Sequence, residues 1–234
     1  MKRQGLIQKN IVNGKVPPVT SFFTLYGGEI EVFIQSDTRF DFEQALRKLE
    51  KAIPEYFLLQ GIDVIYVGDF ADLKDRDLNA AYADGAIYVL PNQSSDQDFL
   101  DDIVHEVAHS LEERFTGFIY GDGKIQQEYK EKYLKLIGLM GKQAQIDIPE
   151  KFFGYTPFDY DPEWDEFLYQ VVGYDTLHLI TPGLFASPYG ATSLREYWAN
   201  TFEHFYLTSD AETAKISPQA YNKIKELDDR SKNL

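Results

Sequence analysis

The sequence predicts an α+β protein, with a small mixed sheet and helices in its N-terminal part and mainly helices in its C-terminal part. Glu29 to Gln35 alternates apolar and polar side chains, as a half-buried strand does. Residues 40–53 and residues 98–115 have apolar side chains at helical spacing. Two more helices are expected to begin near Ser193 and Ser217, which are good helix caps.

Two further strands are expected between the first two helices. Ile62 to Gly68 is an apolar run typical of a buried strand. The pair Asp84-Gly85 predicts a turn that leads into a short strand, Ala86 to Leu90, which Pro91 ends. The expected order is therefore strand, helix, strand, strand ahead of the long helix.

The composition limits the chemistry. The chain has 234 residues, 38 Asp and Glu against 23 Lys and Arg, a formal net charge of -15 and no cysteine. Without thiolates, a transition metal must be held by His, Asp or Glu. The negative charge argues against a nucleic-acid partner and suits a basic or neutral peptide. No apolar run is long enough to span a membrane, and residues 1–15 lack a signal-peptide core, so no membrane partner is expected and the compartment is not indicated.

Two of the four histidines, His105 and His109, stand in the motif HEVAH. Residues four apart on a helix point the same way, so both imidazoles can reach one metal ion. Glu106 lies beside them, where a base for a metal-activated water is expected. The alternative is a pair of surface histidines. The apolar stripe of this helix lies on the opposite side, which argues against core histidines.

A catalytic zinc ion commonly takes three protein ligands and leaves one position for water. The extended motif HExxHxxGxxH is not present, because Glu112 and Phe115 occupy its glycine and third histidine positions. The helix that begins near Ser193 offers Glu196 on its polar side, and we expect this residue to be the third ligand of one zinc ion. The rival ligands are Glu203, Glu128, His178 and His204.

HEVAH together with the later segment SPYGATSLREYWANTF resembles the zinc-binding domain of anthrax lethal factor and the related Pro-Pro endopeptidases. The resemblance covers residues 58–118 and 187–205. It implies a zincin-like metallopeptidase domain in which Glu196 joins the two histidines as a zinc ligand. It also implies that the hydroxyl of Tyr189, seven residues before that ligand, steadies the oxyanion of the reaction.

The chain departs from this family in two places. Asn200 stands where the family has an acidic residue that orients a zinc histidine; an amide can still accept that hydrogen bond, but losing the carboxylate would weaken metal affinity about tenfold or more. The gap between the two zinc-binding segments is also longer. We therefore expect a single domain with an N-terminal lobe (20–119), an insertion (120–185) and a C-terminal lobe (186–234).

The expected insertion contains one predicted helix, residues 124–140, and then a stretch that interleaves aromatic and acidic residues, 152–170. One interpretation is a lid or subsite wall for a basic or proline-containing peptide. The favoured interpretation is that the aromatics pack the insertion onto the domain while the acids face water.

Together these residues predict a zinc metalloendopeptidase. Glu106 would take a proton from water, and Tyr189 would hold charge on the carbonyl oxygen. Residues 86–90 are expected to form the sheet edge that pairs with an extended substrate, or else an interior strand. Two alternatives remain: a phage-particle or toxin-like binding protein with little turnover, and a zinc ion used only for stability, which needs a fourth ligand such as His204.

Overall fold

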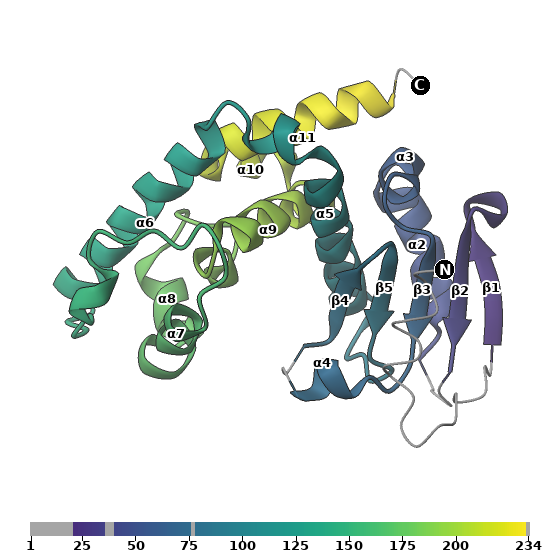
Figure 1. Cartoon of the computed structure of the whole chain (residues 1–234), viewed down its shortest axis with the longest axis horizontal. Helices are drawn as coiled ribbons and strands as arrows, with labels where there is room; N and C mark the ends of the chain where they lie inside the picture. The colour runs from purple at the N-terminus through teal and green to yellow at the C-terminus, as the bar shows by residue number, and fades with distance from the viewer. Residues whose placement is uncertain (1–20, 36–39, 76–77, 233–234) are drawn as a thin grey trace. The chain divides into compact units, whose positions relative to one another are not determined.

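The computed structural model describes residues 21–35, 40–75 and 78–232 (Figure 1). Residues 1–15, which lack a signal-peptide pattern, lie outside the described residues. The chain divides after Arg114 into two compact units, which we call the sheet unit and the helical unit. Among the described helices, none has both the length and the apolar character that crossing a bilayer requires.

The sheet unit confirms the predicted α+β class with a small mixed sheet. Its strands are β1 (Ser21–Leu25), β2 (Ile30–Ile34), β3 (Val64–Val67), β4 (Ala80–Ala83) and β5 (Ala86–Val89). Its helices are η2 (Tyr26–Gly28), α2 (Phe42–Ala52), α3 (Glu55–Leu59), α4 (Ala71–Asp75) and most of α5 (Asp96–Tyr120). The sequence predicted β2, β3, β5, α2 and α5, but not β1 or β4.

The strands lie in the order β1-β2-β3-β5-β4 (Figure 1). β2, β3 and β5 are parallel, whereas β1 and β4 pair with the outer sides of this group in the antiparallel sense. The expectation that residues 86–90 form a sheet edge is wrong, because β5 lies between β3 and β4. The edge beside it is β4, whose sequence AAYA is too short and too weakly apolar to be predicted as a strand.

Burial follows the sequence pattern of each element. In β2, Ile30, Val32 and Ile34 are at most 7% exposed, while Glu31 faces solvent. β3 and β5 are apolar along their length, as central parallel strands usually are. Helix α2 begins where the side chain of Asp41 accepts a hydrogen bond from the Gln44 N–H at 2.9 Å.

The predicted turn at Asp84 and Gly85 joins β4 to β5. Both residues have positive φ, 48° and 82°, as a two-residue type I′ hairpin requires. A Cβ on Gly85 would also lie 3.0 Å from a carboxylate oxygen of Asp63, so space as well as backbone geometry favours glycine there.

Helix α5 extends beyond the predicted residues 98–115 at both ends. Phe115 departs from helical dihedrals (φ −117°, ψ 22°) where the sheet unit ends. The predicted apolar stripe is buried, with no exposed surface on Phe99, Ile103, Val104, Val107, Ala108 or Leu111. Burial of this stripe sets which side of α5 remains available for chemistry.

The described elements of the helical unit are all helices. They are α6 (Lys124–Lys142), η3 (Glu150–Phe152), α7 (Pro162–Glu166), η4 (Phe167–Val172), α8 (Tyr174–Ile180), η5 (Pro188–Ala191), α9 (Leu194–Leu207), α10 (Asp210–Ile216) and α11 (Pro218–Ser231) (Figure 1). The sequence predicted α6, α9 and α11. Residues 120–185, predicted as an insertion, belong to the same compact unit as α9.

Glu128 of α6 joins that helix to the start of α11. Its carboxylate accepts backbone N–H groups of Gln219 and Ala220 at 3.1–3.2 Å. It also accepts the hydroxyl of Tyr197 in α9 at 3.0 Å. A carboxylate at a helix N-terminus satisfies N–H groups that have no partner within the helix. This side chain therefore ties three helices of the unit together.

Lys132 lies one turn after Glu128 and is buried. Its ammonium group donates hydrogen bonds to the backbone carbonyls of Leu184 and Ile216. It also lies 5.6 Å from the ring centroid of Phe185 and 5.5 Å from that of Tyr197. Burial lowers the pKa of Lys132 to about 8, and Glu128 opposes that shift.

We expect the contribution of Lys132 to the free energy of unfolding to rise between pH 8 and pH 10. In this range the folded chain has released the Lys132 proton while the unfolded chain still binds it, so increasing pH favours the folded state at this site. Urea unfolding across this range should show the free energy of unfolding of the wild type rising relative to that of Lys132→Met by roughly 1–3 kcal/mol. The variant is needed because tyrosines titrate in the same range. A relative free energy of unfolding that stays constant or falls would contradict the expectation.

Candidate metal centre

Helix α5 directs both histidines away from its buried stripe. The imidazole centroids of His105 and His109 are 4.9 Å apart, and the rings are inclined by 75°. This is the arrangement of side chains one turn apart on a helix. Val104, Val107 and Ala108 from the same turns have no exposed surface. Because these residues fix the rotation of the helix, the two imidazoles share its opposite side.

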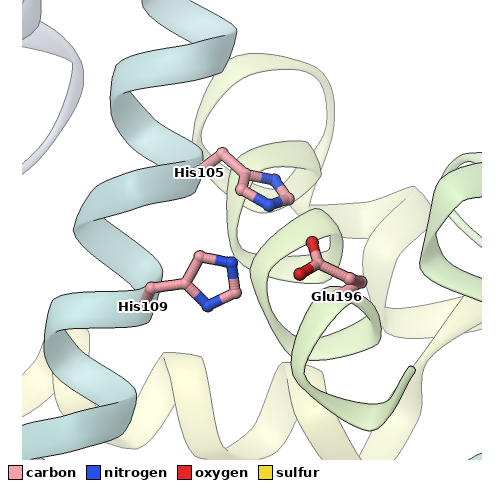
Figure 2. Close-up of side chains that lie close together, drawn as sticks. All are labelled: His105, His109 and Glu196. Atoms are coloured by element: carbon pink, nitrogen blue, oxygen red, sulfur yellow. The ribbon is translucent and has the colours of Figure 1, made fainter. Parts of the chain in front are cut away.

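Glu196 lies in the first turn of α9. Ser193 caps this helix by accepting the Glu196 N–H at 3.2 Å, which confirms the predicted helix start. The carboxylate of Glu196 points toward the two imidazoles (Figure 2). One possible ligand atom from each of His105, His109 and Glu196 lies within 4.8 Å of the others. Among the described residues, no other three His, Asp or Glu side chains form such a group.

The three donors fit a zinc ion. Two imidazoles and one carboxylate are a common protein ligand set of catalytic zinc. Tetrahedral bonds of about 2.0–2.1 Å place ligand atoms roughly 3.4 Å apart, so the observed separations would have to shorten by about 1.4 Å at most. Side-chain rotation covers that distance. Three protein donors leave one tetrahedral position for a water molecule.

Glu106 lies between the two histidines in the sequence and contacts the sheet. Its carboxylate oxygen Oε2 accepts the backbone N–H of Tyr82 at 2.6 Å. Tyr82 is in the edge strand β4, so this N–H is on the side of the strand that does not pair with β5. The hydrogen bond holds the carboxylate beside the open edge of the sheet. The sequence did not reveal this contact, because β4 was not predicted.

Glu112 is a residue that sequence reasoning missed. Its carboxylate oxygen Oε2 lies 3.4 Å from Nδ1 of His109, one turn back on α5. The side chains are 7% and 11% exposed, so this contact is shielded from water. A carboxylate beside one ring nitrogen of histidine favours metal binding through the other. The spacing of three residues after the second histidine was the signal that could have identified it.

Asn200 forms its hydrogen bonds within the helical unit. Its side-chain oxygen accepts the hydroxyl of Ser187, and its nitrogen donates to the backbone carbonyl of Glu196 at 3.1 Å. The amide oxygen that was expected to orient a zinc histidine is therefore bound to Ser187. The carboxylate that contacts a histidine of the candidate site is Glu112.

The rival ligands lie outside the group. Glu128 binds the start of α11, and Nδ1 of His204 lies 2.8 Å from the hydroxyl of Thr213. His178 is exposed on α8. Glu203 lies on α9 but is not a member of the group. His204 therefore does not provide the fourth protein ligand that a purely structural zinc ion would need.

Tyr189 lies in η5, which packs against α9. A Cβ on the next residue, Gly190, would lie 3.6 Å from the Cβ of Asn200, so η5 follows the surface of that helix closely. Burial raises the pKa of Tyr189 above its usual value, and the nearby carboxylates of Glu196 and Asp165 raise it further. The hydroxyl therefore stays protonated at neutral pH and is able to donate a hydrogen bond.

Residues of the predicted insertion hold the segment between Tyr189 and Glu196. The backbone carbonyl of Ala191 accepts hydrogen bonds from the Tyr129 hydroxyl at 3.1 Å and from the Trp164 indole N–H at 3.0 Å. Both donors are buried. The backbone N–H of Leu194 donates to the carbonyl of Pro157 at 3.0 Å.

The aromatic residues of the predicted insertion divide into two groups. Phe152, Trp164 and Phe167 are buried, as the packing interpretation expects. Tyr160 and Tyr169 are each 55% exposed, so packing does not account for them. The favoured interpretation therefore describes only part of this segment.

Replacing Glu112 with glutamine should weaken zinc binding about tenfold or more, because the neutral amide orients and polarises His109 less well than a carboxylate. Glu113→Gln is the matched control, since Glu113 is the next residue on the same helix and is exposed. Zinc affinity would be measured by competition with a chelator, and folding by circular dichroism. Equal affinity in both folded variants would mean that Glu112 does not support His109.

In comparisons with known proteins, no family model, no curated protein and no solved structure matches this chain. The resemblance to lethal factor-like peptidases therefore rests on the residues that carry it. The structure itself establishes the mixed sheet, the helices and a group of two histidines and one glutamate suited to a metal ion.

Proposed function

We propose that this chain is a zinc-dependent endopeptidase with a zincin-like fold that hydrolyses peptide bonds in proteins or peptides. The observation that carries the proposal is the proximity of His105, His109 and Glu196 (Figure 2), with Glu106 next to the first histidine in the sequence. Two imidazoles and a carboxylate leave a position open for water, which a hydrolytic site needs and a structural site does not. When bound, zinc supplies a Lewis acid that makes water a nucleophile near neutral pH and polarises a carbonyl.

Glu106 is the proposed general base. It stands beside the first metal-binding histidine, and the Tyr82 N–H fixes its carboxylate. Its carboxylate takes a proton from the attacking water and later delivers that proton to the leaving amine. Water contributes the hydroxyl group of the new carboxylic acid and the hydrogen of the new amine, so the reaction balances without another reactant.

Tyr189 is the proposed oxyanion donor. Its hydroxyl is protonated, and η5 rests on the helix that carries Glu196. A phenol at this place donates a hydrogen bond to the carbonyl oxygen as negative charge develops on it. The hydrogen bonds of Tyr129 and Trp164 to the Ala191 carbonyl hold the backbone between Tyr189 and Glu196 in place.

β4 takes the substrate-pairing role that was expected of residues 86–90. It is the edge strand next to β5 in the described sheet, and the backbone N–H of its Tyr82 donates a hydrogen bond to Glu106. An extended peptide added to this edge would use backbone hydrogen bonds, which are indifferent to sequence. Selection among peptides must then come from side-chain contacts elsewhere in the site.

Replacing Glu196 with alanine should weaken zinc binding by more than about 100-fold, since loss of a direct ligand costs more than loss of a supporting contact. Glu203→Ala is the control on the same helix, because Glu203 lies outside the group. Chelator competition would give the affinities, and the metal content of the purified protein would give the stoichiometry. Full zinc affinity in Glu196→Ala would exclude this residue as a ligand.

Glu106→Gln should keep zinc but lose cleavage by about 10²–10⁴-fold, because the amide cannot accept the proton from water. A peptide-library digest with and without chelator, analysed by mass spectrometry, would measure this with the wild type as the positive control. Equal cleavage by Glu106→Gln would remove it as the base. If the zinc-loaded wild type cuts no bond, the peptidase proposal fails and the alternative of a binding protein is favoured.

A further inference from the structure

Two tyrosine hydroxyls lie at Asp165 in the helical unit, and a third tyrosine packs against one of these two rings. The Tyr160 hydroxyl donates to one oxygen of Asp165 at 3.0 Å, and the Tyr174 hydroxyl lies 3.4 Å from the other. The ring of Tyr169 packs 5.8 Å from that of Tyr174. We call Tyr160, Asp165, Tyr169 and Tyr174 the tyrosine cluster. All four belong to the segment that the sequence predicted as an insertion.

The tyrosine cluster adjoins the proposed oxyanion donor. The rings of Tyr174 and Tyr189 meet edge to face, with centroids 6.3 Å apart and planes at 84°. Asp165 is also near enough to Tyr189 to help raise its pKa, after burial and Glu196. A peptide whose carbonyl lay at Tyr189 would therefore have side chains within reach of the cluster, since neighbouring residues of an extended chain are only about 3.5 Å apart.

Packing of the segment does not account for the exposed tyrosines of the cluster. In the short helix α7, Trp164 is the residue that packs into the unit, because it is fully buried and its indole N–H donates to the Ala191 carbonyl. The next residue, Asp165, is partly exposed, and Tyr160 and Tyr169 are each 55% exposed. The π-helical turn η4 (Phe167–Val172) follows directly, and such turns often occur at functional sites.

The charge of Asp165 has no cationic partner within the described ranges. Its side-chain hydrogen-bond partners are two tyrosine hydroxyls, and no lysine or arginine of residues 21–35, 40–75 or 78–232 pairs with it. Neighbouring Glu163, by contrast, pairs with Lys151. Each carboxylate oxygen can accept a further hydrogen bond beside the one from tyrosine. A carboxylate beside partly exposed aromatic rings is complementary to a cation.

We propose that the tyrosine cluster is a specificity subsite that binds one arginine or lysine side chain of the substrate, within one or two residues of the bond that is cut. The proposal rests on the proposed peptidase function. The carboxylate would accept a charge-assisted hydrogen bond from the substrate cation, and the tyrosine rings would contact its face. Arginine fits better than lysine, because its flat guanidinium stacks on rings while it hydrogen-bonds to the carboxylate.

The test compares two peptides that differ in one heavy atom of one side chain, a nitrogen in arginine and an oxygen in citrulline. The zinc-loaded full chain is first given a peptide library, which identifies a cleaved sequence and the preferred residue on each side of the bond. Arginine at the best basic position is then replaced with citrulline, which has the same shape without the charge. The quantity measured is the ratio of kcat/KM for the arginine peptide to that for the citrulline peptide.

For the wild type we expect a ratio of about ten or more, as the loss of a charged hydrogen bond predicts. Asp165→Asn should bring the ratio close to one. Asp175→Asn, which removes an exposed carboxylate of α8, should leave it unchanged. Tyr160→Ala removes an exposed ring and should lower the ratio several-fold. A purely structural effect would lower cleavage of both peptides alike and would leave the ratio unchanged.

The possible failures are distinct. If the zinc-loaded wild type cleaves no peptide, the proposed function fails and this inference fails with it. If it cleaves peptides but treats arginine and citrulline alike, or favours proline or an aromatic residue at every position near the bond, the inference alone fails. A ratio that Asp165→Asn leaves unchanged, or that Asp175→Asn lowers equally, would also overturn it.

Discussion

Helix α5 must satisfy two requirements with a single rotation about its axis. Val104, Val107 and Ala108 have to be buried in the core of the sheet unit, and the side chains between them point the other way as a result. Burying such apolar side chains stabilises the fold by about 1.5–3 kcal/mol for a residue as large as valine. Core packing thus sets the side of α5 to which His105 and His109 point, and Glu112 contacts the second of them.

The helical unit secures its part of the candidate site differently. Glu196 and Tyr189 lie at the ends of a short segment whose backbone is held by side chains from α6 and α7. Glu128 and Lys132 bind α6 to α9, α11 and the segment before η5 through buried polar contacts. Such contacts are directional, so they specify position more strictly than apolar packing does. The segment that the sequence set apart as an insertion is therefore part of the framework of α9.

Local pattern predicted much of this fold. Period-two alternation gave β2, apolar runs gave β3 and β5, and helical spacing gave α2, α5, α6, α9 and α11. The neighbours of β5 could not be deduced this way, because strand pairing is decided by contacts between distant residues. β4 has too few apolar residues to stand out, and without it β5 looked like an edge.

In the candidate site, too, local pattern predicted some residues, whereas contacts between distant residues were not predictable. The spacing of HEVAH identified the two histidines, and both the polar side of its helix and the resemblance pointed to Glu196, which lies close to them. Glu112 was accessible from helical spacing but was considered only as a departure from a longer motif. The contacts of Asp165 with Tyr160 and Tyr174 were not accessible, since they depend on how α7, η4 and α8 follow one another in space.

The carbonyl oxygen of Ala191 accepts two hydrogen bonds, one from a residue 62 positions away and one from a residue 27 positions away. A carbonyl oxygen has two lone pairs, so this one has no capacity left. Tyr129 and Trp164 are thus bound to one atom, and either donor that moved away from it would be left in a buried place without this hydrogen bond. Substitutions at residues 129 and 164 would therefore be constrained by the same distant backbone atom as well as by their local packing.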